Sequence, residues 1–241
     1  MTRKNGAKSE AAGAIADPVQ EVLAALRKMS SRGTREGMAR FGIPSENALG
    51  VTVADIRKLA KQLGRDHQLA QALWRTGVYE ARMLTAFLAE AGRVTPTQMD
   101  RWCRDFDSWA ICDALCFHLF DRTPHAFVKV HEWSDRRAEF EKRAAFALLA
   151  GLAGHDRTTG DEPFLATLPL IERAATDERN FVKKGVSWAL RRVGRRSGAL
   201  NVAAVELAEH LAASANPTAR WIGKDALRDI TKPNARRNVG D

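Results

Sequence analysis

The sequence has little cysteine and no long apolar run, and each absence excludes a class of protein. Its three cysteines are Cys103, Cys112 and Cys116, an odd number that argues against a disulfide framework and favours a reducing compartment. No apolar run approaches the roughly 18 residues that a membrane-spanning helix needs. The first residues also lack the continuous apolar core of a secretory signal. We therefore expect a cytoplasmic protein without a membrane partner.

Several catalytic and metal-binding patterns are also missing from the sequence. It contains no Gly-x-Ser-x-Gly elbow, no glycine-rich phosphate loop and no His-Glu-x-x-His motif. Cys112 and Cys116 lie one helical turn apart, close to His118, and could be considered as metal ligands. Short Cys-x-x-Cys loops are absent, however, and neighbours such as Leu115 and Phe117 are apolar, which favours buried free thiols. We expect neither a metal nor a cofactor.

The charge of the chain favours a polyanionic partner. Lys and Arg number 38 against 29 Asp and Glu, which gives a net charge of +9 in 241 residues. Such a balance is typical of proteins that bind DNA, RNA or an acidic membrane surface. With 45% hydrophobic residues, the chain is long enough to bury its own core in one large domain or two small ones. We expect it to fold alone, as a monomer.

Almost all of the sequence has the periodicity of helices, and no stretch alternates as a strand would. Apolar residues recur at helical spacing in seven longer segments: 19–30, 53–63, 79–91, 108–120, 137–153, 179–195 and 217–229. Glycines and prolines separate them at short, regular intervals. We therefore expect a single all-α domain over residues 18–232, between disordered tails at 1–17 and 233–241.

Several of these helices share a weak template in which a cation precedes an apolar helix. Residues 82–92 and 184–194 align without gaps, and 143–153 and 220–230 follow more loosely. Stacked helical hairpins, as in HEAT or armadillo repeats, produce this pattern and form a solenoid with a concave face. An irregular helical bundle remains the alternative. In the solenoid, the cations of the template would make the concave face basic: Arg82, Arg143, Lys184 and Arg220.

One tryptophan lies among cations instead of on an apolar face. On a helical wheel, residues 181–196 divide into two faces. The apolar face holds Val182, Gly185, Val186, Ala189, Leu190 and Val193, and the opposite face holds Lys184, Trp188, Arg191 and Arg195. An indole held among cations suits contact with nucleic acid, which is polyanionic and has flat bases. Alternatively, Trp188 packs under a neighbouring helix and the arginines extend past it.

A carboxylate lies inside an apolar helix. Within residues 106–120, the helix beyond a cap at Asp107 or Ser108 is apolar on every face apart from Asp113 and His118. An uncompensated carboxylate there would cost several kcal/mol, so Asp113 must be paired, near solvent or used in chemistry. It could pair with an arginine such as Arg143, bind a cation, or stabilise positive charge that develops in a reaction. Trp109, four residues earlier, shares its face. The remaining tryptophans are expected to fill gaps between helices: Trp74, Trp102, Trp133 and Trp221.

Three segments, in this order in a basic helical chain, resemble the DNA alkylation repair glycosylases of the AlkD-like HEAT-repeat family. They are SWAICD at Ser108–Asp113, EKRAAFALL at Glu141–Leu149 and FVKKGVSWALR at Phe181–Arg191. The likeness spans about residues 35–230, and the last two segments are close to the family's pattern. The first is looser, because Ala110 stands where many relatives carry an acidic residue.

The resemblance implies roles for four residues. Trp109 and Trp188 would be the two indoles of the active cleft, Asp113 the catalytic carboxylate, and Arg143 a DNA-contacting cation at the edge of the cleft. It also implies hydrolytic excision of purines made cationic by alkylation, of the 3-methyladenine and 7-methylguanine type. The damaged nucleotide would stay out of a deep pocket, unlike in most glycosylases. Some family members lack this activity, so a non-catalytic module that binds nucleic acid or protein is the alternative.

This chemistry fits the residues. An alkylated purine is already a good leaving group, so the enzyme must mainly stabilise the oxocarbenium-like sugar, which a fixed carboxylate and two indole faces can do. In a pure binding module, Asp113 would repel phosphates. We expect duplex DNA to contact the basic face of residues 179–195 and further cations on neighbouring helices: Lys142, Arg143, Arg82 and Arg220. If about six phosphates are neutralised, binding should be strongly salt-dependent and show weak sequence preference.

Overall fold

The computed structural model describes residues 17–232, and within that range it contains helices and no strand. Every one of the seven predicted segments corresponds to a helix. The predicted tails at 1–17 and 233–241 lie outside the described residues except for Asp17, which accepts a hydrogen bond from the Val19 amide and caps the first helix. The helices are α1 (Pro18–Lys28), α2 (Arg32–Met38), η1 (Ala39–Phe41), α3 (Val53–Leu63), α4 (His67–Arg75), α5 (Tyr79–Leu88), η2 (Ala91–Arg93), α6 (Pro96–Arg104), α7 (Trp109–His118), η3 (Phe120–Arg122), α8 (Ala126–Ser134), α9 (Glu139–His155), α10 (Glu162–Leu165), α11 (Leu168–Ala174), α12 (Asn180–Val193), α13 (Gly198–Ala213) and α14 (Pro217–Ile230).

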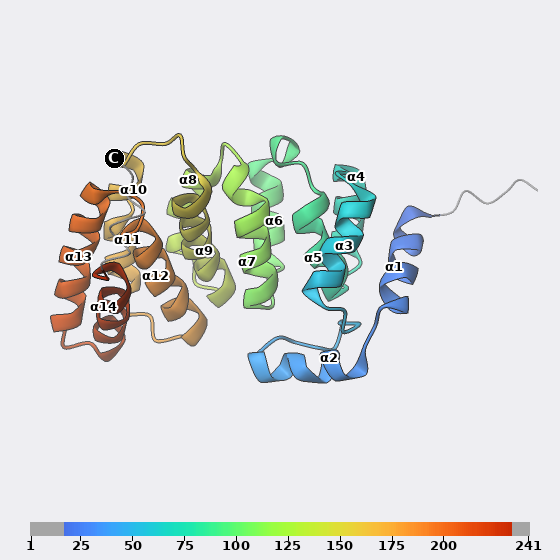
Figure 1. Ribbon diagram of the computed structural model, residues 1–241, viewed down its shortest axis with the longest axis horizontal. Helices are drawn as coiled ribbons and strands as arrows, with labels where there is room; N and C mark the ends of the chain where they lie inside the picture. Colours follow the sequence, from blue (N-terminus) through green and yellow to red (C-terminus); the bar gives the residue numbers. More distant parts are fainter. Residues whose placement is uncertain (1–16, 233–241) are drawn as a thin grey trace, which may run out of the picture.

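The helices stack in a row along the long axis of the molecule, from α1 at one end to α13 and α14 at the other (Figure 1). Consecutive helices pack as hairpins, α4 with α5, α8 with α9, α11 with α12 and α13 with α14. The second helices of these hairpins, together with α7, also pack on one another, in the order α5, α7, α9, α12 and α14. This two-layer arrangement is the predicted HEAT-like solenoid, because each hairpin buries its apolar face mainly against its neighbours.

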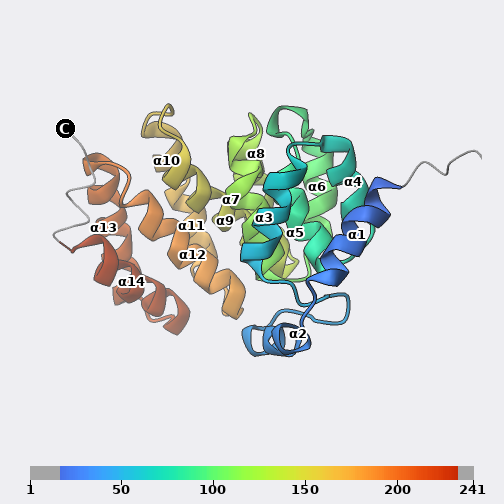
Figure 2. The ribbon, with the colours of Figure 1, turned by 45° about the vertical axis from the view of Figure 1, so that its right-hand side comes forward.

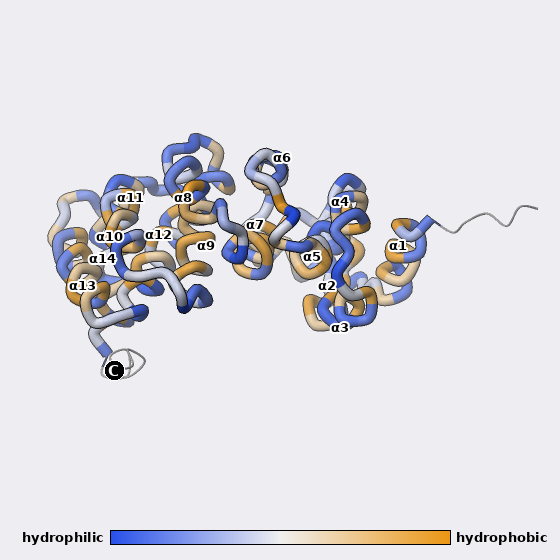
Figure 3. The backbone as a smooth tube through the Cα atoms, turned by 90° about the horizontal axis from the view of Figure 1, so that it is seen from above, coloured by the Kyte–Doolittle hydropathy of each residue, from blue (hydrophilic) through white to orange (hydrophobic). Residues whose placement is uncertain are grey.

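The core follows the contacts between layers. Helix α9 packs against α7, α8 and α12, and every residue from Arg143 to Ala153 is buried. Both α7 and α9 are largely orange, for hydrophobic residues, in the middle of the row (Figure 3). The three cysteines are buried free thiols, as predicted, and Trp74, Trp102 and Trp133 are buried between helices. At Gly223 a Cβ atom would lie 2.3 Å from the Ala212 amide nitrogen, so this glycine permits close contact between α14 and α13.

A buried carboxylate fixes the loop that follows α2 and η1. Glu80 of α5 is fully buried, and its oxygens accept hydrogen bonds from the amides of Leu49 at 2.9 Å, Gly50 at 2.7 Å and Val51 at 3.2 Å. The Gly50 carbonyl in turn accepts a hydrogen bond from the Ser31 amide, immediately before α2. These bonds help to hold the α2–η1 segment below the row of helices (Figure 2).

His118 should make the stability of the fold sensitive to acid. Its Nε2 lies 3.2 Å from the Arg57 guanidinium, and burial together with the charges of Arg57 and Arg122 lowers its pKa to about 4. The unfolded chain therefore binds a proton more readily than the folded protein between about pH 6.5 and 4. We expect the melting temperature to fall as the pH is lowered from about 6.5 to 4, and to fall less steeply in the His118→Gln variant. The matched control is His131→Gln, on the exposed surface of α8; equal slopes for both variants would contradict the assignment.

Candidate active cleft and nucleic-acid interface

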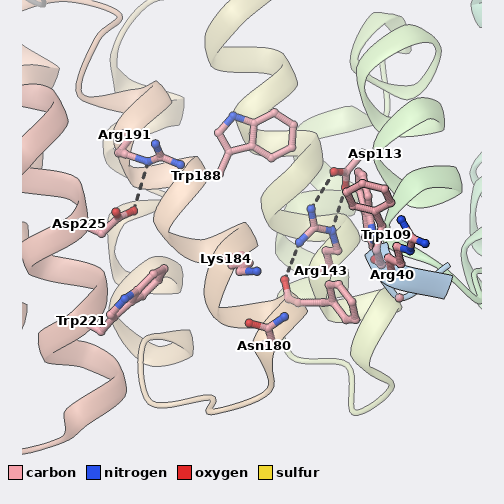
Figure 4. A pocket seen from close by; sticks show the side chains of 13 residues that line it. Arg40, Trp109, Asp113, Arg143, Asn180, Lys184, Trp188, Arg191, Trp221 and Asp225 are labelled. Carbon is pink, nitrogen blue, oxygen red and sulfur yellow. Dashed lines mark hydrogen bonds and ion pairs between the residues drawn. The ribbon is translucent and has the colours of Figure 1, made fainter. Parts of the chain in front are cut away.

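An open cleft of about 850 Å³ lies between η1 on one side and α12 and α14 on the other (Figure 4). Trp109 and Asp113 reach it from α7, and Trp188 reaches it from α12. These residues are up to 79 positions apart in the sequence, and the solenoid brings them to one surface. The structure thus places together the carboxylate and the two indoles that the sequence singled out.

Asp113 is paired with Arg143 and still lines the cleft. Arg143 donates from Nε to Oδ1 at 2.9 Å and from Nη2 to Oδ2 at 2.7 Å, and its Nη1 donates to the Phe181 carbonyl at 2.6 Å. The side chain of Asp113 is 19% exposed and that of Arg143 only 7%. Burial raises the pKa of the Asp113 carboxyl, and the adjacent guanidinium opposes this shift. The result is a carboxylate of fixed orientation with the arginine largely covered.

Arg143 lines the cleft, where the resemblance implies a DNA-contacting cation. Most of its side chain, however, is buried against Asp113 and Phe181. The ion pair is the reason, because a buried guanidinium needs charged and polar partners. Arg143 therefore orients the carboxylate, and its contact with DNA stays a prediction.

The two predicted indoles are held by different contacts. Trp109 donates from Nε1 to the Phe41 carbonyl at 2.8 Å. Trp188 stacks on Phe117 of α7, with ring centroids 5.0 Å apart and an interplanar angle of 15°. The apolar face predicted for α12 is buried throughout. Trp188 is half-buried, so it both packs on a neighbouring helix and borders the cleft.

A third indole was missed by the sequence analysis. Trp221 of α14 was expected to fill a gap between helices, which is wrong, because it is 38% exposed and lines the cleft. The ammonium group of Lys183 lies 5.0 Å from the centroid of its ring. The buried face of α14 consists of Ala219, Ile222, Gly223, Ala226 and Ile230. Trp221 lies on the other face together with Asp225, so the criterion that selected Trp188 could have found it.

Comparison with known proteins agrees with this architecture. Residues 22–230 match the family of DNA alkylation repair enzymes. The chain belongs to this family. A search of the curated proteins finds no match to its sequence. A solved structure described as "a new family of proteins related to the HEAT-like repeat DNA glycosylases with affinity for branched DNA structures" has a TM-score of 0.73 and 18% identity, covering 87% of this chain and 94% of that chain. At this identity the likeness establishes the fold.

In this member of the DNA alkylation repair family, only some of the predicted DNA-contacting cations reach the cleft. Lys184 lines it and is exposed, and Arg191 lines it while its Nε lies 3.7 Å from Asp225. Arg195 forms an ion pair with Asp229. The remaining predicted cations contact groups elsewhere in the protein. Lys142 forms an ion pair with Asp177. Arg82 lies over the ring of Trp74 and donates to the Asp105 carbonyl, and Arg220 donates to the Ser214 carbonyl.

Other residues of the cleft had no signal in the sequence. Arg40 and Phe41 belong to η1, a single short turn without helical periodicity, and Asn180 begins α12. Within residues 17–232, no helix is long and apolar enough to cross a membrane. The same part of the chain holds no group of three or more His, Cys, Asp or Glu side chains arranged for a metal ion.

Proposed function

We propose that this family member is a DNA glycosylase that excises positively charged alkylated purines from duplex DNA and so starts base excision repair. The observation that carries this proposal is the position of Asp113, a fixed carboxylate in an open cleft bordered by three indoles. Membership of the DNA alkylation repair family and the basic composition support it.

The proposed reaction uses the charge of the substrate. When the bond between the sugar C1′ and N9 of the alkylated purine breaks, its electron pair moves to the base and neutralises the positive charge there. The sugar becomes oxocarbenium-like, and a water oxygen then bonds to C1′ and releases a proton to solvent. Asp113 stabilises the developing cation and orients the water, because Arg143 holds both carboxylate oxygens in place.

Selectivity follows from the same charges. Indole faces attract both a cationic base and an electron-poor sugar, each by about 0.5 to 2 kcal/mol, and a neutral base lacks this attraction. We further propose that the damaged nucleotide stays close to the duplex. The cleft is open and its walls lie on separate helices. Such a cleft fits a nucleotide that stays near the duplex better than one that rotates into an enclosed pocket.

The direct test is release of bases from methylated DNA. Purified protein is incubated with methylated genomic DNA, and the soluble products are separated by chromatography. We expect 3-methyladenine and 7-methylguanine to appear, with no purine released from unmethylated DNA. A competing function, a non-catalytic DNA-binding module, is favoured by the solved structure whose family is described as binding branched DNA. Binding of branched or linear duplexes without any base release would support that competitor.

Replacing Trp188 with alanine should slow base release about 10-fold, because one of the aromatic faces beside the substrate is lost. Trp188→Phe should retain most of the activity, since it keeps a ring on Phe117. The measurement is single-turnover release from methylated duplex, together with a melting curve for each variant. A melting temperature lowered by many degrees in Trp188→Ala, with activity restored on cooling, would instead support a packing role.

A further inference from the structure

Phe41 is more exposed than any other large apolar side chain in the described part of the chain. Its exposed fraction is 67%, and it lies on the border of the cleft beside the exposed Arg40. Single apolar residues on a protein surface are common. This one differs because it lines the cleft proposed to receive DNA, next to Arg40, which lies opposite Trp221 of α14 across the cleft (Figure 4).

The backbone at Phe41 is anchored by a hydrogen bond and is followed by a turn that requires glycine. Its carbonyl accepts the hydrogen bond from the Trp109 indole at 2.8 Å. The next residue, Gly42, has a φ of 68°, and a Cβ atom there would lie 3.0 Å from the ring of Phe181. A side chain at this position would therefore be strained and crowded. The exposed ring thus projects from a turn anchored to the same tryptophan that borders the proposed site.

These observations point to an aromatic wedge. We propose that Phe41 inserts its ring between bases of the bound duplex, next to the nucleotide in the cleft, while Arg40 contacts the adjacent phosphate. Proteins that distort DNA use apolar side chains in this way to unstack a base step, and nearby cations hold the backbone. The inference rests on the proposed binding of duplex DNA and adds a residue that distorts it. Insertion of the exposed ring would remove its apolar surface from water, which is favourable, and the anchored backbone limits the freedom that is lost.

Insertion between bases unwinds DNA, so the test is a change of linking number. A relaxed closed plasmid is treated with topoisomerase at equal occupancy by each protein, and the topoisomers are separated after deproteinisation. We expect the wild type and Phe41→Trp to shift the distribution and Phe41→Ala to leave it unshifted. Loss of one stacking contact should also weaken binding to a short duplex about 5- to 30-fold in Phe41→Ala. The matched control is Val202→Ala, which removes another exposed apolar side chain, 60% exposed on α13, and should behave as the wild type.

The outcomes separate this inference from the proposed function. Equal shifts by the wild type and Phe41→Ala, or tight binding by the wild type without any shift, would overturn the wedge and leave the glycosylase proposal standing. A shift that depends on Phe41 in a protein that releases no base would support the wedge and overturn the glycosylase. Absence of DNA binding by the wild type would overturn both.

Discussion

Replacing Asp113 with asparagine should lower the rate of base release by about 100-fold or more, while affinity for DNA stays equal or rises slightly. The size of the loss follows from removing a fixed and mostly buried carboxylate that stabilises developing positive charge. Affinity should not fall, because a negative charge that repels phosphates leaves the cleft. Single-turnover release from methylated duplex and binding to the same unmethylated duplex measure the two effects separately.

The ion pair complicates this experiment and dictates its controls. Asparagine leaves the largely buried Arg143 guanidinium without its charged partner, which can cost several kcal/mol of stability. A melting curve must therefore be measured for the variant, and its rates of base release must be measured at a temperature at which it is folded. The matched control is Asp225→Asn, since Asp225 is another cleft carboxylate and lies near Arg191. We expect it to keep base release within a few-fold of the wild type. If folded Asp113→Asn retains its activity, a residue other than Asp113 must carry the proposed chemistry.

The repeat architecture and α12 were predictable because both depend on periodicity. A helix that packs in a solenoid must be apolar on the buried side, so the two faces of α12 could be assigned from the sequence, and its apolar face is buried throughout. The same rule applied to α14 would have assigned Trp221 to the exposed face of the helix. It was assigned to the core because large aromatics usually fill gaps, although its neighbour on the helix face is Asp225.

The pairing of Asp113 with Arg143 was one of the alternatives that the sequence offered, but the sequence could not decide among them. The sequence left three roles open for Asp113, because a wheel shows which face a residue occupies and not what lies opposite. Only the packing of α9 on α7 brings Arg143 within hydrogen-bond distance. The position of η1 was equally hidden, since three residues have no measurable period. Its contact with Trp109 spans 68 positions and depends on the whole stack of intervening helices.

Binding to duplex DNA should weaken about a thousandfold between 50 and 200 mM salt if about six phosphates are neutralised. The predicted cations fall into two groups, which should contribute differently to the salt dependence of DNA binding. Lys184 is exposed in the cleft and forms no ion pair with any residue of the described range 17–232, so a phosphate would be its first charged partner. Arg195 already contacts Asp229, and binding a phosphate would require it to share or leave that carboxylate.

Two matched variants test this division. In Lys184→Met the plot of log affinity against log salt should become shallower by about 0.9, the amount expected for one lost phosphate contact. Arg195→Met should change the slope by less, because Asp229 already offsets much of its charge. Replacing Asp229 with asparagine should then steepen the slope, since it releases Arg195 and reduces the competition for Arg191. Equal losses of slope for Lys184→Met and Arg195→Met would show that the ion pairs between α12 and α14 do not persist when DNA binds.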